Sequence, residues 1–193
     1  AGTVAEVHHF EEIAGWLGED GRFRLEIDLA SVETLIPIRN ERMRDMLFET
    51  GIFPVATLAA KIDPQPLRDL AVGAQTEVVA EAELELRGQT TGLTIQAVVA
   101  RLKEDTMLVA SAQPLVLNAA VLGLSEGVER LREVAGLPSI SPAVPATFRL
   151  TLKEDPTPGA TVSQRQAGRR AELAGHAPVS PLPRGETAAP ASR

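Results

Sequence analysis

The chain has 193 residues, which is long enough for one well-filled domain with an appendage. Its net charge of −7 argues against nucleic acid or an anionic membrane surface as the main partner, and one Trp without any Tyr leaves no aromatic platform for stacking bases. The absence of cysteine does not fix the redox compartment, because a domain of this size needs no disulfides.

We expect the chain to have been processed or trimmed, because the sequence starts at Ala1 without methionine or a signal peptide. The longest uncharged run, residues 106–125, contains serine, glutamine, proline and asparagine. These polar residues favour a strand followed by a turn over a membrane-spanning helix. The sequence therefore predicts no transmembrane segment.

Alternation of apolar and polar residues predicts a series of antiparallel strands. The first predicted strand, 3–16, changes the phase of its apolar positions near His8 and His9, which indicates a bulge. The clearest alternation lies in 76–87, which is followed by a turn at 88–91. The complete set of seven predicted strands is 3–16, 22–30, 55–62, 76–87, 92–102, 106–117 and 144–152.

Residues 40–51 predict a short amphipathic helix. Asn40 is a good N-cap, Gly51 fits the position after the last turn, and Pro54 prevents continuation. Met43, Met46 and Leu47 share one face, which fits either ordinary core packing or a flexible apolar surface for a ligand. A second helix is predicted from Ser125, as its cap, to Gly136.

Several short motifs resemble the YceI-like family, and the resemblance extends over residues 2–152. They comprise Ser31-Val32-Glu33-Thr34, Arg39-Asn40-Glu41-Arg42-Met43-Arg44, Leu47-Phe48-Glu49, Phe53-Pro54, Val116-Leu117-Asn118-Ala119-Ala120, Gly127-Val128-Glu129 and Leu137-Pro138-Ser139-Ile140. The resemblance implies a lipocalin-like antiparallel β-barrel that holds a long polyisoprenoid or isoprenoid-quinone chain. The hairpins and the scarcity of helices independently favour an all-β barrel with one or two short helices.

YceI-like proteins normally carry one more strand before the position of residues 2–4. An up-and-down antiparallel barrel closes only with an even number of strands, so the seven predicted strands leave a gap between the first strand and 144–152. We expect the gap to be filled by a bent second half of 3–16, by part of the tail, or by a strand of a partner chain. The tail is 154–193, rich in Pro, Ala and Arg, and the barrel domain is 1–153. We expect the tail to be extended and to become ordered only on contact with another chain.

The sequence offers little catalytic chemistry. On a regular strand His8 and His9 point to opposite faces, so they cannot bind one metal unless the strand is bulged there, and a solvent-facing or hydrogen-bonded histidine is the favoured state. Glu77, Glu81, Glu83 and Glu85 have the spacing of one solvated strand face, and no serine has a histidine in a position that suggests a triad. We therefore expect neither an enzyme nor a metal site.

Small inward residues in 76–99 leave room for a tunnel, although they also fit the taper of a packed barrel. The predicted tunnel walls are Phe10, Ile13, Trp16, Ile27, Met43, Leu47, Phe48, Phe53, Ala82 and Ala97. The resemblance implies a periplasmic or secreted protein that binds a long isoprenoid lipid, either a polyprenyl chain or a quinone, and we expect these side chains to line its tunnel. No cofactor is required for such binding. The alternative is a structural subunit of a larger assembly, or a homo-oligomer, that uses the barrel as a platform and the tail as a strap.

Overall fold

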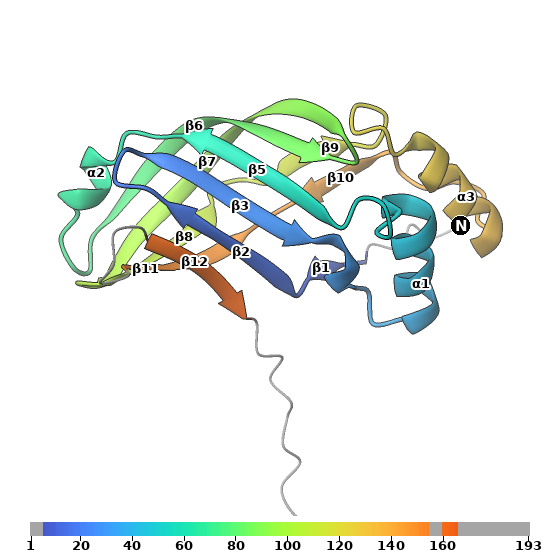
Figure 1. The fold of residues 1–193 in the computed structure, drawn as a ribbon, viewed down its shortest axis with the longest axis horizontal. Coiled ribbons are helices and arrows are strands. Elements are labelled where there is room, and N and C mark those ends of the chain that lie inside the picture. The colour runs from blue at the N-terminus through green and yellow to red at the C-terminus, as the bar shows by residue number, and fades with distance from the viewer. Residues whose placement is uncertain (1–5, 155–159, 166–193) are drawn as a thin grey trace, which may run out of the picture.

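The protein is a closed antiparallel barrel of eight strands, in the order β11-β12-β2-β3-β5-β6-β7-β8 (Figure 1). The computed structural model describes residues 6–154 and 160–165. The barrel strands are β2 (Glu12–Leu17), β3 (Arg22–Asp28), β5 (Val55–Lys61), β6 (Gln75–Leu86), β7 (Gln89–Lys103), β8 (Thr106–Ser111), β11 (Arg149–Lys153) and β12 (Ala160–Arg165). The predicted antiparallel barrel is therefore confirmed.

Short elements cover the two ends of the barrel. The helix α2 (Gln65–Arg68) lies at one end, and α1 (Pro37–Arg42), the π-helix η2 (Met43–Phe48) and α3 (Ser125–Ala135) lie at the other (Figure 1). We call the second end the mouth. The remaining elements are the 3-10 turn η1 (Leu29–Ser31), the pair β1 (His9–Phe10) with β4 (Val32–Glu33), and the pair β9 (Leu115–Asn118) with β10 (Ala143–Ala146).

The eighth strand comes from the predicted tail. β12 pairs antiparallel with β2 from Ala160↔Leu17 to Arg165↔Glu12, and with the end of β11 at Leu152↔Val162 and Lys153↔Thr161. It fills the gap that the strand count predicted, and it does so from the same chain. The expectation that the tail becomes ordered only on contact with another chain is therefore wrong for residues 160–165. Residues 155–159 and 166–193 of the predicted tail lie outside the described residues.

Three predicted strands are interrupted in the structure. The first predicted strand divides at Glu11, whose amide donates to the Ser31 carbonyl at 3.1 Å, and not at a bulge near the two histidines. The ranges 106–117 and 144–152 each divide into a barrel strand and a strand of the β9–β10 pair. The β6–β7 turn consists of Arg87 and Gly88 alone, both with positive φ as in a type I′ hairpin.

The predicted helix boundaries near the mouth are partly wrong. The first helix starts at Pro37, which suits a first helical position, so Asn40 lies inside it and is no N-cap. It continues into η2, whose last residue is Phe48, and Glu49 follows as the C-cap in the left-handed conformation. The sequence predicts Gly51, and not Glu49, at the position after the last turn. Ser125 does not cap α3 either, whereas Gly136 ends that helix as predicted.

Candidate functional site: the barrel interior and its mouth

The inner wall of the barrel is apolar. Along β6 and β7 the buried positions alternate with exposed ones, and the four glutamates predicted to form a solvated face, at 77, 81, 83 and 85, are all exposed. The interior is filled mainly by aliphatic side chains, among them Leu25, Leu58, Leu84, Ile95, Val99, Met107, Leu150 and Leu152. Two short side chains from the predicted tunnel, Ala82 and Ala97, lie in this wall at 4% and 6% exposure.

The end covered by α2 is closed by an arginine. Arg101 is the one buried charged residue among those described, and its Nη2 and Nη1 donate to the carbonyls of Leu67 and Glu104 at 2.8 and 2.6 Å. Its Nη1 also lies 3.7 Å from the Glu154 carboxylate. The guanidinium therefore ties α2 to the β7–β8 turn. Arg101 continues the inward positions of Ile95, Ala97 and Val99 along β7. The alternation in the sequence therefore indicated that this arginine faces inward, and our prediction missed it.

The mouth is closed by apolar side chains from η2. Leu47 and Phe48 are buried, and the Phe48 ring lies 5.7 Å from the ring of Phe10. The helix α3 packs on η2 backbone to backbone: a Cβ on Gly127 would lie 2.7 Å from the Met46 carbonyl oxygen. π-helical turns occur frequently at functional sites. We call η2 the lid.

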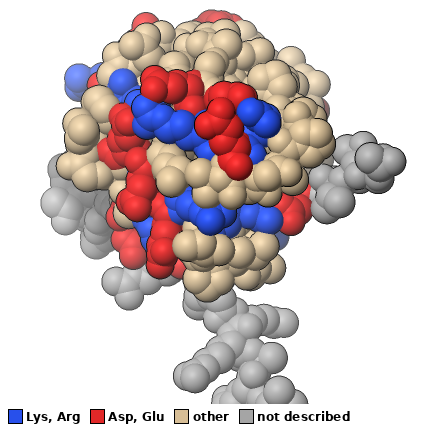
Figure 2. Space-filling model, turned by 90° about the vertical axis from the view of Figure 1, so that its right-hand side faces the viewer, with Lys and Arg blue, Asp and Glu red and all other residues tan. Residues whose placement is uncertain are grey.

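A group of charged residues holds the lid, and we call Glu49, Arg87, Arg130 and Glu126 the mouth ion cluster. The Glu49 carboxylate pairs with Arg87 on the β6–β7 turn and lies 3.8 Å from Arg130 on α3. Arg87 also donates to the Gly123 carbonyl at 3.1 Å and lies 5.9 Å above the Phe53 ring. Acidic and basic side chains lie side by side across this end of the molecule (Figure 2).

The turn that leads into α1 is fixed by buried polar groups. The Asn40 side-chain oxygen accepts hydrogen bonds from the Thr34 amide at 2.9 Å and the Thr34 hydroxyl at 2.7 Å. Asn40 Nδ2 donates to Glu33 at 3.0 Å, and the Leu35 amide donates to the same carboxylate. These bonds, led by the one from Asn40, hold the pKa of Glu33 below its ordinary value. We call Glu33, Thr34 and Asn40 the turn clamp.

Most of the predicted tunnel walls are at least half-buried. Leu47, Phe48, Ala82 and Ala97 are buried, and Phe10, Ile13, Ile27 and Met43 are half-buried against the core. Phe53 is half-buried beneath Arg87. Trp16 is wrong as a wall residue, because β2 turns Ile13 and Leu17 inward and leaves Trp16 on the outer surface, 40% exposed.

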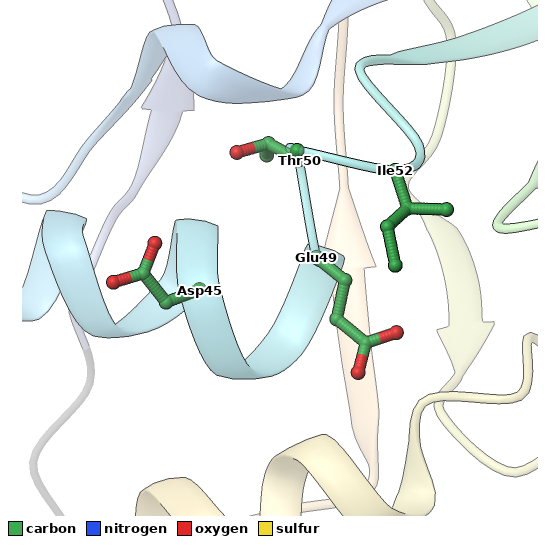
Figure 3. A pocket seen from close by; sticks show the side chains of 5 residues that line it. Asp45, Glu49, Thr50 and Ile52 are labelled. Carbon is green, nitrogen blue, oxygen red and sulfur yellow. The ribbon is translucent and has the colours of Figure 1, made fainter.

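Two open depressions lie on the outside of the described part of the protein. One, of about 310 Å³, is lined by Asp45, Glu49, Thr50, Gly51 and Ile52 beside the lid (Figure 3). The other, of about 290 Å³, lies on the outer face of β2 and β3 and is lined by Ala14, Gly15, Trp16, Arg24 and Glu26. Neither is lined by the buried wall residues, so the tunnel itself stays a prediction.

The described residues carry neither a metal-binding cluster nor a membrane-spanning helix. Residues 6–154 and 160–165 contain no group of three or more His, Asp or Glu side chains arranged to hold a metal ion. His8 lies 3.7 Å from Glu6 and 3.1 Å from Arg39. None of the described helices has the length and apolar character needed to cross a bilayer.

Comparison with known families and structures identifies the fold. The model of the YceI-like domain matches residues 3–152. A solved polyisoprenoid-binding domain from Saccharophagus degradans, implicated in plant cell wall breakdown, is 36% identical over 83% of this chain and 86% of its own, with a TM-score of 0.74. Comparison with curated proteins gave no match.

BcnA from Burkholderia cenocepacia is 16% identical, over 75% of this chain and 86% of its own, with a TM-score of 0.57. The Campylobacter jejuni YCEI protein is 12% identical, over 80% of this chain and 88% of its own, with a TM-score of 0.57. At these identities the likeness shows the fold alone. Because the family model spans most of the chain, this protein belongs to the YceI-like family.

Proposed function

We propose that the barrel binds one long isoprenoid chain, of the polyprenyl or quinone type, without transforming it. The observation that carries the proposal is the inner wall, where aliphatic and small side chains run from the lid to Arg101 at the opposite end. An apolar chain needs such a wall and few polar groups. The Saccharophagus degradans domain, 36% identical, is described as polyisoprenoid-binding, which supports the same ligand class here.

Binding without catalysis is favoured by the residues of the wall. Its described buried members carry no nucleophile next to a base, and Arg101 is held by main-chain carbonyls. The proposal includes the periplasm as the compartment, which cell fractionation would test. The expected alternative, a structural subunit of an assembly, gains no specific observation from the structure.

Entry of a chain requires space that the packed side chains now occupy. Leu47 and Phe48 lie at the mouth, and Ala60 faces Ala82 across the β5–β6 pair. We propose that the lid swings outward to admit the isoprenoid chain. The isoprenoid chain then lies along the wall beside Ala60 and Ala82, where the short side chains leave the least volume to displace. Interiors are close-packed, so even a small addition to this wall competes with the ligand.

Organic extraction of the purified protein followed by mass spectrometry tests the proposal. We expect a polyprenyl or quinone species in stoichiometric amount, and its loss from Ala82→Phe and from Ala97→Phe. Overpacking should destabilise the Ala82→Phe variant by about 1–3 kcal/mol, so its fold is checked by circular dichroism.

The matched control is Ala59→Phe, on the outer face of β5 opposite Glu83, which should keep its lipid. The proposal fails if the wild-type protein yields no isoprenoid. It also fails, at least for this wall, if Ala82→Phe and Ala97→Phe retain the lipid at the level of the control.

A further inference from the structure

The turn before α1 exposes an unusual group of aliphatic side chains. Leu35, Ile36 and Ile38 are 83%, 38% and 51% exposed, and Pro37 between them is also exposed. Leu35 and Ile36 are the one pair of sequence neighbours among the exposed large apolar residues of the described chain. We call Leu35, Ile36 and Ile38 the apolar tip.

The backbone holds the tip outward at a conformational disadvantage. Leu35 has φ +63°, in the left-handed region that residues with side chains seldom adopt. The turn clamp fixes both ends of the turn, since the Asn40 side chain bonds Thr34 and the Glu33 carboxylate accepts from the Leu35 amide. A leucine in this conformation that contributes almost nothing to the core indicates a side chain selected for an external contact.

The tip lies at the mouth end of the barrel, beside the lid (Figure 1). The lid follows α1 without interruption, so the tip and the lid belong to one continuous stretch of chain. Val7, 88% exposed, lies near the same turn, because its neighbours Glu6 and His8 both contact Arg39 of α1.

We propose that the apolar tip inserts into the surface of a lipid bilayer and brings the mouth of the barrel against it. This inference rests on the proposed function, because an isoprenoid cargo is collected from or delivered to a membrane. A stable protein interface buries roughly 800 Å² on each partner, far more than a tip of three side chains offers. A bilayer, in contrast, accepts a small protruding apolar group at its headgroup boundary.

The charges around the tip indicate a neutral bilayer surface. Arg39 pairs with Glu6 and Arg44 donates to the Ala30 carbonyl at 3.2 Å, while Glu41 and Asp45 are exposed on the same helical stretch. The neighbourhood therefore has no strong excess of positive charge, in agreement with the net charge of −7. Apolar insertion, and not attraction to anionic lipids, would drive the contact.

Sedimentation of the full chain with phosphatidylcholine vesicles tests the proposal. We expect the wild-type protein to bind, the double variant Leu35→Asp/Ile38→Asp to bind at least tenfold more weakly, and binding to persist at about 0.5 M salt, where surface charges are screened. The matched control is Val72→Asp/Val79→Asp, two aliphatic residues at 56% and 64% exposure away from the tip, which should bind like the wild type.

A second variant separates docking from folding. Leu35→Asn suits the left-handed backbone and removes the aliphatic group, so its melting temperature should stay or rise while vesicle binding falls. Docking is refuted if the wild type does not bind vesicles, if both double variants lose binding equally, or if binding requires anionic lipid. A wild-type dimer that the tip variant makes monomeric would assign the tip to a second copy and would also overturn the proposal.

The result can be distinguished from a failure of the proposed function. Isoprenoid content is measured on the same preparations by extraction. Vesicle binding through the tip by protein that never contains isoprenoid would refute the proposed cargo and leave docking standing. Isoprenoid-loaded protein that ignores vesicles would refute docking alone.

Discussion

Neutralising Glu49 should loosen the lid and speed release of the proposed isoprenoid ligand. Glu49 is the acidic centre of the mouth ion cluster, between Arg87 and Arg130. Its side chain is 27% exposed and that of Arg87 is 18% exposed, so solvent screens the pair only in part. In Glu49→Gln the Arg87 guanidinium keeps the Gly123 carbonyl and the Phe53 ring but loses its anionic partner.

The expected magnitude lies between the values for surface and buried pairs. Exposed ion pairs contribute about 0–1 kcal/mol, whereas removing one partner of a buried pair costs about 3–5 kcal/mol. For this partly buried pair we expect a loss of about 1–3 kcal/mol in the free energy of unfolding. Because the pair joins the lid to the barrel, a loss of about 1.4 kcal/mol on lid opening alone would raise the open population roughly tenfold.

Two measurements check this prediction. Urea unfolding gives the change in stability, and transfer of lipid from loaded protein to excess vesicles gives the release rate. The comparison variant is Glu126→Gln, which removes the exposed i,i+4 partner of Arg130 and should change stability by at most about 0.5 kcal/mol. Release and stability in Glu49→Gln that equal those of the wild type would show that the ion pairs of Glu49 do not hold the lid.

Three further predictions concern stability. Arg101→Met should lower the free energy of unfolding by about 2–4 kcal/mol, because the carbonyls of Leu67 and Glu104 lose a charged donor. The control Lys103→Met, at an exposed position, should have little effect. Equal urea unfolding midpoints for the two variants would contradict this prediction. The pKa of Glu33 is depressed in the folded state, so its ionised carboxylate stabilises the fold. This stabilisation should be complete above about pH 4.5 and should disappear as the pH falls through the lower folded-state pKa. In unfolding titrations the stabilities of the wild type and Glu33→Gln should converge at that low pH, and a difference that stays constant with pH would refute the prediction. Truncation after Glu154 removes β12, so amide exchange should accelerate in β2; unchanged protection of β2 would show that β12 does not pair there.

Strand positions could be predicted from the sequence because alternation reports directly which side chains face the core. In β6 inward aliphatic residues alternate with outward residues, which from Glu77 to Glu85 are glutamates except for Val79, and the predicted strand differs from the observed one by a single residue at each end. The interruptions at Glu11 and between β8 and β9 could not be predicted in the same way. They depend on partners far along the chain, such as the Ser31 carbonyl that receives the Glu11 amide.

The burial of most predicted wall residues could be predicted from the sequence, whereas the closure of the mouth could not. Apolar residues at inward positions gave the buried alanines and the lid, whereas Trp16 was assigned by residue type and not by the phase of its strand. The mouth ion cluster joins residues 38 positions apart, Glu49 and Arg87, both with positive φ. Composition and spacing carry no signal for such a pair, because only the folded turn brings the two side chains together.

The positions of the motif residues separate closure of the barrel from recognition of its cargo. Four polar residues of the 31–54 stretch are engaged by other protein groups: Asn40 bonds to Glu33 and to Thr34, and Glu49 bonds to Arg87. They fix the turn and the lid, which any apolar cargo would require. If the proposed isoprenoid ligand is bound, selection by chain length falls to wall residues such as Ala82. Exchanging wall residues with another YceI-like protein should then change the extracted lipid, whereas exchanging the clamp should change stability only.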